Sequence, residues 1–347
     1  MRPTVSRLDL WVNPVFDEII TQSGATLSVS PAHGDNPRTL AELRQAHAYL
    51  VSAAKDELPR EWFVSRELLS QCPDLLCVSS SGAGYDTVDV AACTEAGVAV
   101  VNQAGMNADS VAEHTFALLL AVQRRIVHAH QLMRTATGFS RESLMGHEIR
   151  GTCIGLIGIG EIGRRVVRIA QGFGMRVCAY DPLLDDATIR ARGAEPMDLD
   201  TLIATSDVVS LHCPLNAQTR GMFSTSQFAA MKPGSVFITT ARGGIHDETA
   251  LNTALASGHL AGAGLDVWDQ EPPGNDAPLL QHDNVVGSFH TAGVTHEARR
   301  NVARGAAEQL VMMLRGERPP RLLNPDVWPQ FLQRLSQYSF HSSAVSL

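Results

Sequence analysis

Short apolar runs rich in β-branched residues alternate with amphipathic stretches along most of the chain. In the N-terminal part these runs predict strands at residues 8–12, 26–30, 48–52, 75–79 and 98–101. From residue 153 the pattern restarts and predicts strands at residues 153–157, 176–180, 208–211, 236–239, 261–265 and 285–288. Strands that alternate with helices build parallel sheets covered by helices on both faces. The two series therefore predict an α/β protein with two doubly wound parallel-sheet domains.

Two longer stretches with helical periodicity lie outside these series. The segment Ser110-Val111-Ala112-Glu113 matches a capping box, in which the serine and glutamate side chains bind backbone amides of the first turn. It predicts a helix that runs to Gln123. Apolar residues at helical spacing predict a second helix from Thr295 to Arg315. This second helix is expected to return the chain to the first domain.

These elements divide the chain into two domains. We expect a discontinuous domain from residues 1–105 and 298–347, and an inserted domain from residues 106–297. The length of 347 residues is sufficient for two separate cores. Residues after Trp328 show no clear period and are interpreted as a tail of undefined role.

The composition argues against several classes of function. The formal net charge is -8 and there is no basic stripe, which argues against nucleic-acid binding. The longest strongly apolar run, residues 116–122, is too short to cross a bilayer, and no signal-like segment opens the chain. The six cysteines form no C-x-x-C pair, and the histidines show no metal-ligand spacing. We therefore expect a cytoplasmic protein with reduced thiols and no metal, membrane or nucleic-acid partner.

A glycine-rich turn marks a candidate cofactor site. The strand predicted at residues 153–157 leads into Gly158-Ile159-Gly160-Glu161-Ile162-Gly163, and a helix-forming stretch follows. Gly158 permits the tight turn, Gly160 lets the backbone approach a pyrophosphate, and Gly163 lets helix and strand pack closely. Asp181, after the next strand, can bind both adenosine ribose hydroxyls and repels a 2′-phosphate, which favours NAD over NADP. The glycine pattern alone also fits FAD, S-adenosylmethionine or a purely structural turn.

Polar residues follow the predicted strands of the inserted domain at their carboxyl ends, where open parallel sheets bind ligands. They are His212, Arg242, Asp266, Glu271 and His290. Viewed singly, each has a structural alternative, such as a surface arginine, a helix-capping carboxylate or a core histidine. Their joint occurrence along one edge of the sheet favours a catalytic site.

This set matches the needs of hydride transfer to a 2-keto acid. Arg242 can hold the carboxylate and the carbonyl with its planar guanidinium. His290 can donate a proton to the alkoxide that forms and can remove it in the reverse direction. Glu271 can hydrogen-bond the other ring nitrogen of His290 and fix the tautomer.

Two further groups complete the predicted contacts. In the first domain, the amides of Gly82, Ala83 and Gly84 can bind the substrate carboxylate, because no large side chain obstructs them. Asp266 can accept a hydrogen bond from the nicotinamide carboxamide and select the face for hydride transfer. The sequence thus predicts an NAD-dependent oxidoreductase that acts on a small 2-keto or 2-hydroxy acid.

With these residues, the chain resembles the D-isomer-specific 2-hydroxyacid dehydrogenases over residues 45–325. The resemblance rests on the following segments: Gly82-Ala83-Gly84-Tyr85-Asp86, Ser110-Val111-Ala112-Glu113-His114, the glycine turn with Asp181, His212-Cys213-Pro214-Leu215, Ala241-Arg242-Gly243, Gly264-Leu265-Asp266-Val267 with Glu271-Pro272, and His290-Thr291-Ala292-Gly293. Their order and spacing are similar to those of the family.

The resemblance implies that Arg242, Glu271 and His290 form the catalytic set. It also implies a Rossmann-like NAD-binding inserted domain, a substrate-binding discontinuous domain, a D-configured product, and a homodimer built around the helix near Ser110. The implied NAD contacts are Gly158, Gly160, Glu161, Ile162, Gly163, Asp181, His212, Cys213, Pro214, Thr240, Ala241, Asp266, His290, Ala292 and Gly293.

The chain departs from the family pattern at three positions. Phe289 stands where proline usually precedes the catalytic histidine, His246 stands where valine is more frequent, and Phe139 replaces a common tryptophan. These changes concern substrate shape rather than reaction type. We expect Phe289, Trp268 and two loops, residues 52–56 and 82–86, to shape the substrate pocket.

Two alternatives remain open on sequence grounds. Glu271 argues against a formate dehydrogenase, since that activity pairs the histidine with glutamine. An NADH-binding co-repressor or sensor on the same fold retains the same residues and stays an alternative. The residues do not identify the 2-hydroxy acid or the physiological direction.

Overall fold

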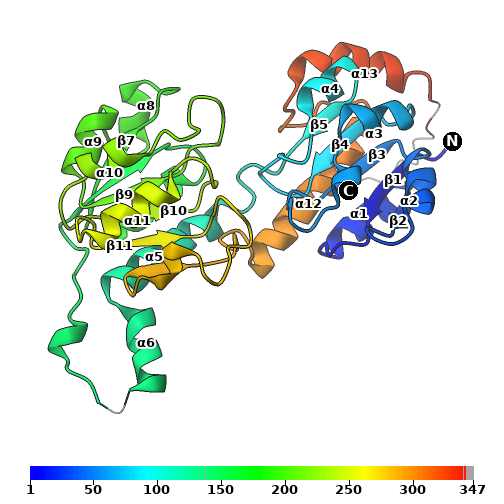
Figure 1. The fold of residues 1–347 in the computed structure, drawn as a ribbon. Helices are drawn as coiled ribbons and strands as arrows, with labels where there is room; N and C mark the ends of the chain where they lie inside the picture. The colour runs from blue at the N-terminus through cyan, green and yellow to red at the C-terminus, as the bar shows by residue number, and fades with distance from the viewer. Residues whose placement is uncertain (137, 339, 341–347) are drawn as a thin grey trace. The chain divides into compact units, whose positions relative to one another are not determined.

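The computed structural model describes residues 1–136, 138–338 and 340, and the chain divides into two compact units (Figure 1). Unit 1 consists of residues 1–107 and the described residues from Thr295 onward, and unit 2 consists of residues 108–294. Each unit holds one parallel sheet with helices on both faces. The predicted fold class, two doubly wound α/β domains of which one is discontinuous, is confirmed.

Unit 1 contains a five-stranded sheet in the order β2-β1-β3-β4-β5, and all neighbouring strands are parallel. The strands are β1 (Thr4–Leu8), β2 (Thr26–Ser30), β3 (Ala48–Val51), β4 (Cys77–Ser80) and β5 (Ala99–Val101). The helices are α1 (Val15–Gln22), α2 (Asn36–Leu43), η1 (Arg60–Trp62), α3 (Arg66–Gln71), α4 (Val90–Glu95), α12 (His296–Leu314), η4 (Pro325–Val327) and α13 (Trp328–Leu335).

The first strand prediction was wrong. The strand occupies Thr4–Leu8, whereas residues 9–12 form a loop in which the Asp9 carboxylate accepts a hydrogen bond from the Ala32 amide at 2.8 Å. Ser6 and Arg7 interrupt the apolar pattern of the true strand, although Ser6 is fully buried in the sheet. Because a buried polar residue interrupts the apolar pattern, the strand was not recognised. The prediction was shifted instead to the apolar residues that follow it.

The C-terminal helices complete unit 1. The helix predicted at residues 295–315 is present as α12, and the hydroxyl of Thr295 accepts a hydrogen bond from the Ala298 amide at 3.0 Å at its start. This helix packs against α1 and against strands β3 and β4. The interpretation of residues after Trp328 as a tail was wrong for α13, because Phe331 is fully buried in the core of unit 1.

Unit 2 contains a seven-stranded parallel sheet in the order β12-β11-β10-β9-β6-β7-β8. Its strands are β6 (Cys153–Ile157), β7 (Arg176–Tyr180), β8 (Glu195–Pro196), β9 (Val208–Leu211), β10 (Val236–Thr239), β11 (Gly262–Leu265) and β12 (Val285–Gly287). Its helices are α5 (Ala108–Gln123), α6 (Ile126–Thr135), η2 (Glu142–Leu144), α7 (Gly163–Gly172), α8 (Asp186–Ala191), α9 (Leu199–Thr205), α10 (Thr225–Ala230), α11 (Glu248–Ala256) and η3 (Pro278–Gln281). The strand order reverses between β6 and β9, which is where such sheets bind ligands.

Helix α5 opens unit 2 and packs against α7 and the strands β10, β11 and β12. It begins at Ala108, so Ser110 lies inside its first turn and the predicted capping box at Ser110 is wrong. Glu113 is exposed on the outer face of the helix. In the part of the chain that the structure describes, no helix combines the length and apolarity needed to cross a membrane.

Candidate active site

The carboxyl ends of six strands of unit 2 lie in register. The aligned residues are Tyr180, Ile157, Leu211, Thr239, Leu265 and Gly287. The residue that follows each of them begins the loop at the ligand-binding edge of the sheet. These residues are Asp181, Gly158, His212, Thr240, Asp266 and Ser288. The fold therefore collects at one edge most of the positions that the sequence singled out.

The glycine turn joins β6 to α7 with the geometry of a dinucleotide-binding turn. Gly158 adopts a φ of +94°, and a Cβ atom there would lie 2.9 Å from the amide nitrogen of Cys213. A Cβ atom on Gly163 would lie 2.5 Å from the carbonyl oxygen of Gly158. Among the described residues, the amides of Gly160, Glu161 and Ile162 have no hydrogen-bond acceptor. Such amides before a helix suit a pyrophosphate group.

Asp181 lies beside this turn at the end of β7. Its carboxylate accepts hydrogen bonds from the amides of Ile159 at 3.0 Å and Leu183 at 3.1 Å. These amides fix the carboxylate next to the glycine turn, where an adenosine ribose would bind. Glu161 forms ion pairs with Arg164 and Arg165 on α7.

The loops after the next two strands contribute partly or fully buried residues without charge. Burial lowers the pKa of His212 to about 4, so its ring is neutral at pH 7, and its Nε2 atom lies 2.9 Å from Ser210 Oγ. Burial raises the pKa of the Cys213 thiol to about 11. Thr240 Oγ1 lies 3.3 Å from Thr115 Oγ1 of α5, and Ala241 is nearly buried. A nicotinamide ring, which carries no net charge in its reduced form, suits such surroundings.

His290 and Glu271 form a close pair. His290 Nδ1 lies 2.9 Å from Glu271 Oε2, and the other carboxylate oxygen accepts a hydrogen bond from the Trp268 amide at 3.1 Å. Because an ionised carboxylate only accepts, Nδ1 of His290 carries the hydrogen of this bond. The Nε2 atom of His290 is therefore the one that can exchange a proton with a substrate.

The surroundings keep Glu271 ionised. Burial raises the pKa of this carboxyl, but the hydrogen bond and charge of His290, the Trp268 amide and the charge of Arg242 together lower it below its usual value. The guanidinium of Arg242 donates a hydrogen bond to the carbonyl of Ala241 at 2.7 Å. Arg242, Glu271 and His290, predicted as the catalytic set, thus come together in unit 2.

Asp266 is fully buried and organises the loop that carries His290. Its carboxylate accepts hydrogen bonds from the amides of Thr291 at 2.8 Å and Ala292 at 2.9 Å, and from Ser288 Oγ at 2.6 Å. Its backbone carbonyl accepts a hydrogen bond from the His290 amide at 2.7 Å. Ala292 and Gly293 therefore belong to a turn that is tied to the end of β11.

In unit 1, the loop after β4 presents three consecutive amides. The carbonyls of Gly82, Ala83 and Gly84 accept hydrogen bonds from the Gln103 amide, the Asn102 side chain and the Ser80 hydroxyl, respectively. The amides of the same three residues have no acceptor among the described residues. This arrangement suits the binding of a carboxylate.

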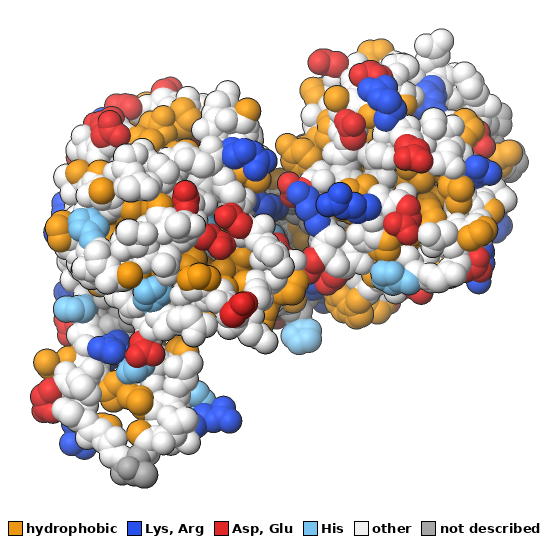
Figure 2. All heavy atoms as spheres, in the orientation of Figure 1, with side chains coloured by type: hydrophobic (Ala, Val, Ile, Leu, Met, Phe, Trp, Pro, Cys, Tyr) orange, Lys and Arg blue, Asp and Glu red, His pale blue; other side chains and the backbone are white. Residues whose placement is uncertain are grey.

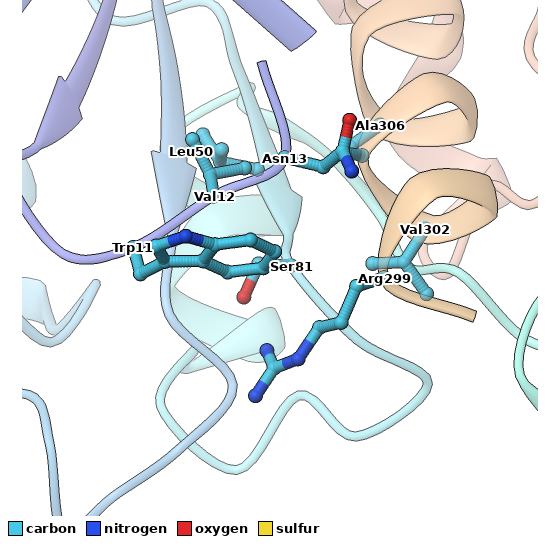
Figure 3. A pocket seen from close by; sticks show the side chains of 9 residues that line it. Trp11, Val12, Asn13, Leu50, Ser81, Arg299, Val302 and Ala306 are labelled. Atoms are coloured by element: carbon cyan, nitrogen blue, oxygen red, sulfur yellow. The ribbon is translucent and has the colours of Figure 1, made fainter. Parts of the chain in front are cut away.

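A small hollow, open to solvent, lies next to this loop in unit 1. Figure 3 shows Trp11, from the segment after β1, and Arg299 of α12 side by side at this hollow, with Ser81 behind Trp11 and Leu50 above it in the view. The guanidinium carbon of Arg299 lies 5.7 Å from the centroid of a Trp11 ring. The hollow therefore offers an aromatic wall and a positive charge.

Two residues expected to shape the substrate pocket differ in exposure, and two residues of the site were missed by the sequence analysis. Trp268 is only 3% exposed and packs in the core of unit 2, whereas Phe289 is 71% exposed. The sequence assigned no role to Ser288 or to His114, which bind each other and Asp266. Two features of the sequence could have indicated them. Ser288 lies at the end of a predicted strand, and His114 lies in a motif shared with the family.

Comparisons with known proteins agree with this site. Residues 116–292 match the model of the D-isomer specific 2-hydroxyacid dehydrogenase NAD binding domain. A glyoxylate reductase of Korarchaeum cryptofilum is 38% identical over 267 residues, which are 76% of this chain and 80% of that protein. A D-3-phosphoglycerate dehydrogenase of Archaeoglobus fulgidus is 40% identical over 253 residues, 73% of this chain and 48% of that protein.

The solved structures give the same result. The crystal structure of a glyoxylate reductase from Paecilomyes thermophila superimposes with a TM-score of 0.82 and 28% sequence identity, covering 94% of this chain and 99% of that one. The matched family model and the glycine turn with Asp181 both indicate NAD as the cofactor. The chain belongs to the D-isomer-specific 2-hydroxyacid dehydrogenase family, and its relatives include oxidoreductases.

Proposed function

We propose that this protein reduces a small 2-keto acid to the D-2-hydroxy acid with NADH and also catalyses the reverse oxidation. The observation that carries the proposal is the 2.9 Å contact between His290 Nδ1 and Glu271, near Arg242, beside the NAD-binding edge of unit 2. An acid–base pair next to a guanidinium matches the charges that change in this reaction.

Each group has a separate role in the proposed reaction. Bound NADH supplies the hydride to the substrate C2 atom. Arg242 holds the carboxylate and polarises the C2 carbonyl. His290 donates the Nε2 proton to the oxygen as its charge develops, and the ionised Glu271 stabilises the imidazolium before transfer. The amides of the loop Gly82-Ala83-Gly84 bind the substrate carboxylate.

The NAD contacts proposed from the sequence are consistent with the observed turn. The amides of Gly160, Glu161 and Ile162 suit the pyrophosphate, and Asp181 suits the adenosine ribose. The remaining proposed contacts, all on the same edge of the sheet or its loops, are Gly158, Gly163, His212, Cys213, Pro214, Thr240, Ala241, Asp266, His290, Ala292 and Gly293.

The choice of substrate depends on the group attached to C2. A glyoxylate reductase and a D-3-phosphoglycerate dehydrogenase are both among the relatives, so small and anionic side chains need testing. The chain spans about half the length of that phosphoglycerate dehydrogenase. Aromatic side chains complete the set worth testing.

The deciding experiment measures NADH oxidation with a panel of 2-keto acids that carry hydrogen, small, aromatic or anionic groups on C2. Chiral chromatography then identifies the product, for which we expect the D configuration. His290→Asn serves as the control and should reduce turnover by roughly two to four orders of magnitude while NADH still binds. NADH binding without turnover of any panel member would favour the co-repressor or sensor alternative. An L product would contradict the proposed stereochemistry.

We also propose that the protein is a homodimer. Helix α6 and the segment after it project from unit 2 as an arm, and none of the ten residues of α6 is buried (Figure 1). Figure 2 shows hydrophobic side chains on this arm. Its exposed hydrophobic residues are Ile126, Met133, Phe139 and Met145. Exposed apolar side chains that gather on one projecting element favour association with another protein surface, here a second copy of this chain.

A further inference from the structure

A chain of hydrogen bonds connects helix α5 to the loop of His290. His114 Nε2 lies 2.8 Å from Ser288 Oγ, and Ser288 Oγ lies 2.6 Å from Asp266 Oδ1. His114 Nε2 is also 3.7 Å from Asp266 Oδ1. All three residues belong to unit 2, and Asp266 is fully buried.

The direction of each bond follows from the chemistry of the groups. The carboxylate of Asp266 only accepts, so the Ser288 hydroxyl donates its hydrogen to Asp266. The same oxygen must then accept from His114, which requires a hydrogen on Nε2 of His114. The neutral Nε2–H tautomer and the imidazolium both satisfy this requirement, whereas the tautomer with a bare Nε2 does not.

The loop that this chain supports holds an unfavourable backbone conformation. His290 has a φ of +53°, in the left-handed region that residues with a Cβ seldom occupy. Such a conformation persists only where its surroundings enforce it. Here the consecutive amides of His290, Thr291 and Ala292 all donate to Asp266, the first to its carbonyl and the others to its carboxylate.

We propose that His114 and Ser288 are positioning residues for the proton donor. Together they fix the Asp266 carboxylate, which holds the turn at residues 290–292 and so aims the His290 ring. Neither residue needs to touch the substrate or the cofactor. This inference rests on the proposed function, because it assigns His290 the acid–base role.

The kinetic test compares variants that remove or retain each hydrogen bond. Ser288→Ala removes a hydrogen bond to the charged Asp266 and should lower kcat about tenfold, while KM for the keto acid changes less than threefold. His114→Leu removes the donor to Ser288 and should lower kcat by a similar factor if the two residues act as one chain. Ser288→Thr restores the hydroxyl and His114→Gln restores an N–H donor, so both should keep kcat within about threefold of the wild type. The proposal would be overturned if the conservative variants lowered kcat as much as Ser288→Ala and His114→Leu do.

A double-mutant cycle tests whether the residues act as one chain. If they do, His114→Leu should have little further effect on kcat in the Ser288→Ala background, whereas independent residues give multiplied losses. His282→Gln is a matched control, because its ring bonds Asn252 at 2.8 Å in the same unit but away from this loop, and it should leave kcat unchanged. Thermal melting and quenching of NADH fluorescence verify that each variant folds and binds the cofactor.

A measurement without turnover separates this inference from the proposed function. Proton–nitrogen NMR of protein labelled at histidine, with His114 assigned from the His114→Gln spectrum, should show a hydrogen on His114 Nε2. A bare Nε2 with the hydrogen on Nδ1 would overturn the inference even in an active enzyme. If the wild type reduces no 2-keto acid, the proposed function fails, and the NMR result still decides whether the hydrogen-bond chain exists.

Discussion

At the scale of single residues, the Glu271–His290 pair makes the reaction depend on pH in opposite ways in its two directions. Keto-acid reduction needs the imidazolium, so it should fall as pH rises. Hydroxy-acid oxidation needs the neutral ring, so it should fall as pH drops. Although burial opposes it, the hydrogen bond and charge of His290 lower the pKa of the Glu271 carboxyl, so a negative charge lies beside the ring.

Replacing Glu271 with glutamine tests this coupling. Glu271→Gln removes the charge but keeps a hydrogen-bonding group of similar size, so the imidazolium loses stabilisation. We expect the limb of the reductive profile and the limb of the oxidative profile both to move to lower pH. The measurement is kcat/KM against pH in both directions for wild type and variant. Limbs that stay in place or move upward would show that Glu271 does not act through His290.

The buried ring of His246 should make the stability of the fold sensitive to acid. The ring is 1% exposed, lies 5.4 Å from the ring of Phe237, and neither nitrogen has a hydrogen-bond partner among the described residues. Burial lowers its pKa to about 4, against about 6.5 in an unfolded chain. The unfolded state therefore binds a proton first, so stability is full above about pH 6.5 and is lost as pH falls toward 4.

His246→Val removes this titration. The free energy of unfolding of the variant, relative to that of the wild type, should rise by about 2 kcal/mol between pH 8 and pH 5. Comparing the two pH values cancels any constant effect of the smaller side chain. Urea unfolding at both pH values provides the measurement. A difference between variant and wild type that does not change with pH would contradict the burial of a neutral ring.

The sequence revealed some of these residues and not others for a physical reason. Apolar strands closely precede Arg242, Glu271 and His290. Because the carboxyl ends of parallel strands meet at one edge of the sheet, the sequence was sufficient to predict that these residues lie together. His114 and Ser288 are 174 residues apart, and their contact depends on how α5 packs on the sheet. No local pattern encodes that packing, and a histidine or serine on its own has many structural uses.

At the scale of elements, β7 and the glycine turn together determine the cofactor. The carboxylate of Asp181 is held by the amides of Ile159 and Leu183, so its charge lies where a 2′-phosphate of NADPH would bind. We expect kcat/KM for NADH to exceed that for NADPH at least about tenfold, or about 1.4 kcal/mol. Asp181→Ser should narrow this preference, because it removes the repulsion and keeps a polar group.

A nearby acid supplies the control for Asp181. Asp185→Ser replaces a carboxylate that accepts a hydrogen bond from the Thr188 amide at the start of α8, and serine retains that capping ability. This variant should keep the preference for NADH. Equal efficiency of the wild type with both cofactors, or an equal effect of the two substitutions, would contradict the role of Asp181.

Elements with a regular pattern were predicted well, and those with buried polar residues or atypical ends were not. The alternation of apolar residues predicted α12 and six of the seven strands of unit 2 within a few residues, and it missed the two-residue strand β8. The first strand was misplaced because Ser6 is buried, and the start of α5 was misplaced because Ser110 fits a capping pattern that the helix does not use. Helix α13 was missed because it spans only eight residues, although its apolar side chains gather on one face and Phe331 among them is fully buried.

At the scale of the whole molecule, each unit has its own buried apolar cores. Separate clusters of buried side chains cover the two faces of each sheet, for example around Phe237 and Phe116 in unit 2 and around Phe16 and Tyr49 in unit 1. The arm is the exception, because its side chains contribute to none of these clusters. Its exposed apolar residues therefore favour a contact outside the unit.

The proposed homodimer supplies that contact and can be tested directly. Met133 is 85% exposed and Phe139 is 67% exposed, so replacing both with glutamate leaves the cores of the unit unchanged. Light scattering after size exclusion should give the wild type about twice the chain mass of 37.4 kDa, and the Met133→Glu/Phe139→Glu variant a mass near that of one chain.

Leu183 provides the matched control for the arm, because it is 88% exposed in the same unit but lies beyond β7 rather than on the arm. Leu183→Glu adds the same kind of charge at an equally exposed apolar position, so it should leave the dimer intact. If the wild type is monomeric, or if the arm variant and the Leu183 variant dissociate equally, the arm is not the dimer contact. Dissociation of the arm variant alone assigns the interface to the arm, since burying a glutamate without a partner is unfavourable at an apolar contact.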